Sequence, residues 1–136
     1  MRGYTLLEMI LTLAVLTTIM VALAMRLSIV SERLAVREEA SAGRLFLERC
    51  YGYAIASQQT IRVKINPSSM ISYLVDGTQL ALHPVRQGVM LAPASTHRSE
   101  LALYPSLSAS PASLSFSKGG ASCSLIVSLR GRFRIT

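Results

Sequence analysis

Histidine and cysteine, the residues most often used to build metal and nucleophilic sites, are scarce in this 136-residue chain, with two of each. His83 precedes a proline and His97 lies in a polar stretch, and neither has a cysteine or carboxylate at ligand spacing. The chain also lacks a G-x-S-x-G elbow, a glycine-rich phosphate loop and a motif of paired carboxylates. We therefore expect a noncatalytic protein with no metal or cofactor and with both histidines at the surface.

Acidic residues are also few, since 7 Asp and Glu face 14 Lys and Arg, for a formal net charge of +7. The excess is concentrated in residues 60–136, which hold eight basic residues and two acidic ones. The length excludes a large multidomain enzyme, and the 51% hydrophobic content is enough to pack a core. One basic domain that is not disordered is expected.

Charge is missing altogether between Glu8 and Arg26, and no proline interrupts this stretch. Together with Tyr4 to Leu7, the run is long enough for a helix to cross a hydrocarbon layer of about 30 Å, with little bend. A cleaved secretory signal ending at Ala22-Leu23-Ala24 is the competing interpretation, and would leave a soluble binding protein. Glu8 argues against it, because a carboxylate is costly in lipid and has no task in a signal. Thr5 to Glu8 also fits a local capping box.

Residues 26–59 carry mixed charges, including Arg44 and Glu48 four residues apart, and should continue the helix. Two glycines, Gly43 and Gly52, each lower helix propensity by about 1 kcal/mol relative to Ala and predict a loose middle. The apolar residues recur at helical spacing and predict a face that packs on a globular head. They are Leu45, Leu47, Cys50, Tyr51, Ala54 and Ile55.

After Gln59 the pattern changes to short strands, with turns at Asn66–Ser69 and Asp76-Gly77. The predicted fold class is α+β: a long N-terminal transmembrane helix with its second half packed on a small antiparallel β head at residues 60–136. Pro93 to Ser99 and Ser106 to Ser113 are expected to be surface loops. The predicted strands are 60–65, 70–75, 79–83, 88–91, 101–104, 113–117, 122–128 and 129–135.

Three arginines alternate with other residues at the end of the chain: Arg130, Arg132 and Arg134. On a strand they would share one face at a spacing of roughly 6.7 Å, close to that of every second phosphate along a nucleic-acid strand. Lys118, on a turn expected to adjoin them, would assist the arginines in contacting nucleic-acid phosphates. Two interpretations stay open: a DNA-binding row, and an edge strand whose charges prevent aggregation.

The segment Gly3-Tyr4-Thr5-Leu6-Leu7-Glu8, followed by the apolar run, resembles the N-terminus of type IV pilins and pseudopilins. The resemblance implies a leader at residues 1–3, cleavage by a prepilin peptidase between Gly3 and Tyr4, and N-methylation of Tyr4, where the family usually has Phe. Residues 4–25 would anchor the protein in the inner membrane and later form the filament core. The missing proline hints at a minor subunit.

In such filaments the carboxylate matching Glu8 is thought to pair with the terminal amine of a neighbouring subunit. Pairing makes two charges tolerable in an apolar bundle where each alone is costly, and so would set the register of assembly. The partners implied are other pilin subunits. An extracytoplasmic head would also permit a disulfide between Cys50 and Cys123, which we favour slightly over two buried thiols.

The head resembles the FimT and GspH type of minor pilins and pseudopilins, including the competence pseudopilin ComGD. The residues that carry this resemblance are Ala54 to Gln59, Ile61 to Ile65, Ser113 to Gly120, and Gly131 to Arg134. In some FimT-type proteins a terminal Gly-Arg-x-Arg is associated with DNA binding. The expectation is a subunit for DNA uptake in natural transformation. The alternatives are a GspH-type subunit of type II secretion and an assembly subunit without DNA binding.

Overall fold

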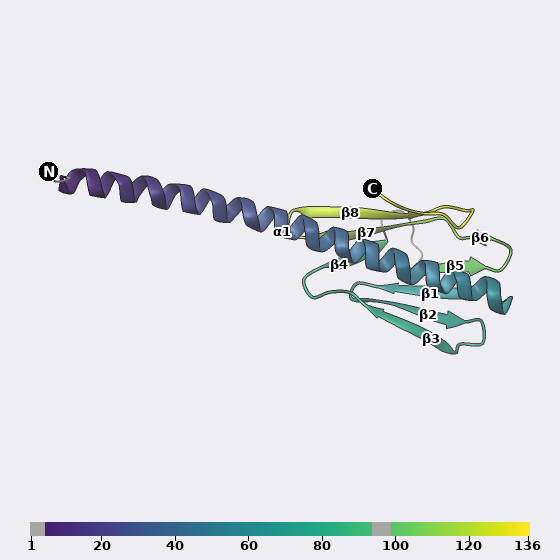
Figure 1. Ribbon diagram of the computed structural model, residues 1–136. Coiled ribbons are helices and arrows are strands. Elements are labelled where there is room, and N and C mark those ends of the chain that lie inside the picture. The colour runs from purple at the N-terminus through teal and green to yellow at the C-terminus, as the bar shows by residue number, and fades with distance from the viewer. Residues whose placement is uncertain (1–4, 94–98) are drawn as a thin grey trace. The chain divides into compact units, whose positions relative to one another are not determined.

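The computed structural model describes residues 5–93 and 99–136, and the chain divides into two compact units, one ending at Ser31 and the other spanning Glu32–Thr136. Among these described residues, one helix, α1 (Leu6–Ser57), contributes to both units, and nine strands follow it in the second (Figure 1). The strands are β1 (Ile61–Asn66), β2 (Ser69–Leu74), β3 (Gln79–Pro84), β4 (Met90–Pro93), β5 (Glu100–Tyr104), β6 (Ser108–Ala109), β7 (Ala112–Lys118), β8 (Ala121–Val127) and β9 (Phe133–Ile135).

The first unit consists of the apolar part of α1. Its helix begins after Thr5, whose carbonyl accepts hydrogen bonds from the N–H groups of Glu8 (2.9 Å) and Met9 (3.3 Å). The three threonines of the run donate their hydroxyls to carbonyls three residues earlier, so their polarity is satisfied within the helix. Within the described chain, α1 alone is long and apolar enough to cross a membrane, with a mean hydropathy of 2.3 over an 18-residue window.

In the second unit, residues 32–57 of α1 bury one side of the helix. The buried residues along this stripe are separated alternately by four and by three positions in the sequence. They are Val36, Ala40, Gly43, Leu47, Cys50 and Ala54. The predicted face is therefore confirmed at Leu47, Cys50 and Ala54. It is wrong at Leu45, which is 54% exposed because it lies off this stripe. The expected pair of Arg44 Nε and Glu48 Oε1 forms at 2.7 Å.

Gly43 has a packing role rather than the predicted loosening one. It is buried, and a Cβ on it would lie 3.0 Å from Met70 Cε and 3.0 Å from Phe116 Cζ. The missing side chain lets the helix approach β2 and β7 closely. Gly52, by contrast, has open space around it.

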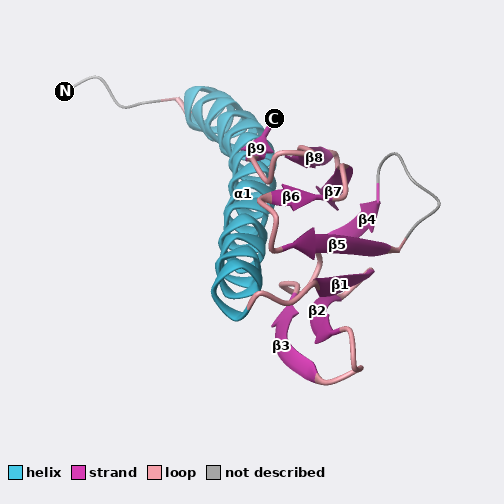
Figure 2. Cartoon of the chain, turned by 90° about the vertical axis from the view of Figure 1, so that its right-hand side faces the viewer, coloured by secondary structure: helices cyan, strands magenta, loops and turns pink. Residues whose placement is uncertain are grey.

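The strands form two antiparallel sheets. The first has the order β3-β2-β1-β5-β6 and the second β4-β7-β8-β9. Backbone hydrogen bonds join them, from Leu91 N–H to the Pro67 carbonyl (3.1 Å) and from Ala109 N–H to the Leu129 carbonyl (3.0 Å). Figure 2 shows the strands of both sheets beside the second half of α1.

Alternation along the strands separates a core face from a solvent face. Ile61, Val63 and Ile65 of β1 are buried, while Arg62 and Lys64 between them are exposed. The core cluster takes residues from α1 and from both sheets, with Phe116 and Leu47 fully buried. The β head is thus packed on the helix, as predicted.

Besides the C-terminal strand, two segments of the head differ from the sequence-based assignments. β4 begins at Met90 rather than at Gly88, because Gly88 adopts the left-handed conformation (φ 84°) of the preceding turn. The segment Ser106–Ser113 is more than a surface loop, since it contains β6, and Ala109 is 1% exposed. The other predicted loop, Pro93 to Ser99, lies mostly outside the described residues.

Candidate functional site

The predicted strand 129–135 is wrong in its first half, because Leu129 to Gly131 form a turn between β8 and β9. Its backbone closes on Ser128, whose N–H donates to the Arg132 carbonyl (2.9 Å) and whose carbonyl accepts from Gly131 N–H (3.0 Å). The Ser128 hydroxyl also accepts from Arg132 N–H (3.1 Å). Gly131 is left-handed here (φ 67°), which an alternating sequence pattern does not reveal. We call residues 128–132 the arginine turn.

The three arginines therefore do not form one row on a strand. Arg130 and Arg132 belong to the arginine turn, and Arg134 lies in β9 opposite Ile126. All three are exposed, and the ion pairs among the described residues involve none of them. The guanidiniums are thus available to an external anion.

Lys118 is not next to these arginines. It ends β7 at the turn into β8, whereas the arginine turn follows the other end of β8. The seven residues of β8 separate the two turns by roughly 20 Å. The Lys118 side chain lies over Gly88 instead, 3.5 Å from where a Cβ of that residue would be. The prediction that Lys118 adjoins the arginines and assists their contact with phosphates is therefore wrong for the arginine turn.

An aromatic side chain from α1 supports the arginine turn from inside. The Tyr51 ring meets Phe133 edge-on, with centroids 6.0 Å apart. A Cβ on Gly131 would lie 2.8 Å from Tyr51 Cε1 and closer still to the hydroxyl. That hydroxyl is buried and has no hydrogen-bond partner among the described residues. Only a glycine therefore fits at position 131, next to the Tyr51 hydroxyl.

The N-terminal site residues are partly described. Glu8 lies in the first turn of α1, at the position a capping box requires after Thr5. Gly3 and Tyr4, the predicted cleavage and methylation residues, lie outside the described residues.

The predicted disulfide is not formed, and both cysteines are free thiols. Cys50 is buried in the helix stripe, whereas Cys123 lies on β8 in the second sheet. Burial raises the pKa of the Cys50 thiol above its ordinary value. Cys50 is therefore an unreactive core residue.

His83 is not the surface residue that the sequence suggested. Its Nε2 lies 3.0 Å from Oε1 of Glu39, a carboxylate on the buried side of α1, and its ring stacks on Phe46 at 5.5 Å. It borders a groove of about 570 Å³ between α1 and the β2–β3 hairpin. The partners are 44 residues apart, so no local motif signals the pair.

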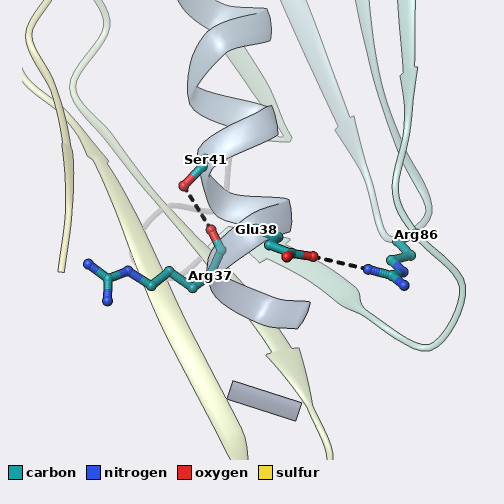
Figure 3. Close-up of polar contacts among 4 residues, drawn as sticks. All are labelled: Arg37, Glu38, Ser41 and Arg86. Carbon is teal, nitrogen blue, oxygen red and sulfur yellow. Dashed lines mark hydrogen bonds and ion pairs between the residues drawn. The ribbon is translucent and has the colours of Figure 1, made fainter. Parts of the chain in front are cut away.

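An ion pair also connects the helix to the head, between Arg86 Nη1 and Glu38 Oε2 at 3.2 Å. Figure 3 shows these two side chains pointing toward each other, while Arg37 extends in another direction. Both members are more than half exposed. Over residues 5–93 and 99–136 no cluster of three metal-ligating side chains occurs.

Comparison with solved structures finds the same architecture in minor pilins and pseudopilins. The type IV minor pilin FimU of Pseudomonas aeruginosa superposes with a TM-score of 0.66 at 14% identity, covering 78% of this chain and 91% of FimU. The minor pseudopilin EpsH of the Vibrio cholerae type 2 secretion system gives 0.62 at 17% identity, covering 74% and 95%. No family model matches the sequence, and no curated protein matches it.

A long N-terminal helix that packs its second half on antiparallel sheets is thus a fold shared with these two proteins. The chain has the pilin-like fold, in the form found in minor pilins and GspH-type minor pseudopilins. This agrees with the class indicated by Gly3 to Glu8 and the apolar run.

Proposed function

We propose that this protein is a noncatalytic minor pilin that acts in DNA uptake. A prepilin peptidase cleaves it between Gly3 and Tyr4, Tyr4 is methylated, and residues up to about Met25 hold it in the inner membrane before assembly. In the filament, Glu8 pairs with the terminal amine of a neighbouring subunit. The head contacts DNA phosphates through Arg130, Arg132 and Arg134.

The arginine turn carries this proposal. Its guanidiniums are exposed and, among the described residues, unpaired, and hydrogen bonds to Ser128 and the Tyr51 ring hold the backbone beneath them. Arginine forks match phosphate oxygens in geometry, and a preformed turn loses little conformational freedom on binding. Residues 60–136 add a net positive field around it. Binding should therefore be weak, independent of sequence and sensitive to salt.

The test measures duplex DNA binding by the full chain in a zwitterionic detergent over a range of salt concentrations. Replacing Arg130 and Arg132 by Gln should lower the log–log salt slope by roughly two units, one for each phosphate that the variant no longer neutralises. Arg37→Gln with Arg49→Gln is the matched control, since both are exposed on α1 and unpaired among the described side chains. Equal slopes for the two double variants would refute the DNA contact and leave the arginines as protection of an edge strand.

A subunit of a type II secretion pseudopilus is the second candidate, favoured by the likeness to EpsH at nearly the same TM-score as to FimU. Deletion of the gene separates the two. Lost transformation with normal secretion supports DNA uptake, and the reverse supports secretion.

A further inference from the structure

The solvent face of the first sheet, on the side away from α1, combines arginine with tyrosine. Arg62 of β1 is paired directly with Tyr73 of β2 on one side and Ala102 of β5 on the other, and side chains opposite each other share a face. Tyr104 is two residues beyond Ala102 and so lies on the same face, diagonally across from Arg62. We call Arg62, Tyr73 and Tyr104 the tyrosine face.

These side chains are accessible. Arg62 is exposed, Tyr104 is 40% exposed and Tyr73 is partly exposed. Arg62 and Tyr104 also line one hollow of about 580 Å³, a volume that suits a small planar group. The core side chains Ile61, Val63, Leu101 and Leu103 point to the opposite side of the same strands.

Charge on this face favours an anion at Arg62. Glu100 of β5 stands opposite Lys64, the other exposed cation of β1, and lines the same hollow as Arg62, but the ion pairs of the described residues join it to neither. Two cations against one carboxylate leave this face net positive. Arg62 stands opposite Ala102 and Tyr73, and the ion pairs of the described residues do not include it. A guanidinium that lies between two aromatic rings and has no ion-pair partner among the described residues suits a ligand with phosphates and flat bases.

The arginine turn adjoins the edge strand of the sheet that carries the tyrosine face. The Leu129 carbonyl, next to Arg130, accepts a hydrogen bond from Ala109 of β6 at 3.0 Å. From β6 the sheet runs through β5, which carries Tyr104, and β1, which carries Arg62, to β2 (Figure 2). Three strand spacings cover about 14 Å, within reach of a short oligonucleotide.

We infer that the tyrosine face binds single-stranded nucleic acid, with bases stacked on Tyr104 and Tyr73 and a phosphate on Arg62. The inference rests on the proposed function for its class of ligand but places the bases on a different surface from the arginine turn. Open sheets that present aromatic rings to solvent bind unpaired bases in this way, because the rings stack on every base. A duplex, whose bases are already stacked, would gain only the phosphate contact.

The test compares two fluorescein-labelled strands of equal length, about 12 nucleotides, one of thymidines and one abasic, on the full chain in a zwitterionic detergent. The phosphates are the same in both, so the ratio of the two affinities isolates the bases. The wild-type chain should bind the thymidine strand on the order of tenfold more tightly. Tyr104→Ala should reduce this preference severalfold without changing the salt slope, and Tyr104→Phe should retain it. Arg62→Gln should lower the slope by roughly 0.7.

Tyr53→Ala is the matched control, since this tyrosine is 49% exposed on α1, away from the tyrosine face. Equal wild-type affinity for both strands, or a preference that survives replacement of both Tyr73 and Tyr104 by Ala, overturns the inference. If binding then still depends on Arg130 and Arg132, the proposed function stands without it. A preference that persists after Arg130 and Arg132 become Gln, together with an unchanged salt slope, supports the tyrosine face and removes the arginine turn. Binding of neither strand refutes both.

Discussion

At the residue scale, Gly131 determines the shape of the arginine turn. It combines a left-handed backbone with a contact from Tyr51 that leaves no space for a Cβ. Gly77 has a similar positive φ of 88°, but a Cβ added there would meet nothing within 4 Å. Alanine substitution at Gly77 therefore tests backbone strain alone, whereas at Gly131 it tests backbone strain together with steric conflict.

We expect Gly77→Ala to lower the free energy of unfolding by about 1 kcal/mol, the usual cost of a left-handed alanine. Gly131→Ala should cost about 3 kcal/mol, because the Tyr51 ring must also move. Chemical denaturation of the full chain in detergent, followed by tyrosine fluorescence, measures both. Equal losses would mean that Tyr51 does not support the arginine turn.

The attachment of α1 to β3 belongs to the scale of elements, and depends on Glu39 and His83. Removing His83 leaves a carboxylate on the buried side of α1 without its hydrogen-bond partner, which is costly. We expect His83→Ala to lower the free energy of unfolding by about 2 kcal/mol. Arg86→Ala, which removes the exposed pair with Glu38, should cost less than about 1 kcal/mol. An equal effect of the two substitutions would show that the His83 pair is as weak as a surface pair.

The elements also show what a sequence can predict. The apolar run, the Arg44–Glu48 pair and the alternation in β1 are local signals, and each predicted its element correctly. Arg130 to Ile135 alternate as well, yet only Phe133–Ile135 is a strand, because Gly131 is left-handed in the preceding turn. Its contact with Tyr51, which leaves no space for a Cβ, joins residues 80 positions apart in the sequence. The pairing of Glu39 with His83 and the separation of the two cysteines likewise depend on sheet order. Such contacts have no local signature.

At the scale of the whole molecule, the first unit and the second have different tasks in the proposed filament. The first unit exposes an apolar surface and one carboxylate, Glu8, near its start. Both suit a bundle of like helices in which Glu8 meets the terminal amine of a neighbour. The second unit carries the exposed arginines and tyrosines of the two proposed DNA contacts.

Glu8→Gln should therefore leave the protein in the membrane, and improve its insertion if anything, because a neutral amide is less costly in lipid than a carboxylate. Its incorporation into filaments should fall at least severalfold, since the amine of the neighbouring subunit loses its counter-charge. Quantitative immunoblots of membrane and sheared-filament fractions measure both quantities. Glu38→Gln, an exposed carboxylate of the second unit, is the control and should assemble normally. Normal amounts of the Glu8→Gln protein in filaments would reduce Glu8 to a helix cap, because a cap stabilises its own helix and selects no partner.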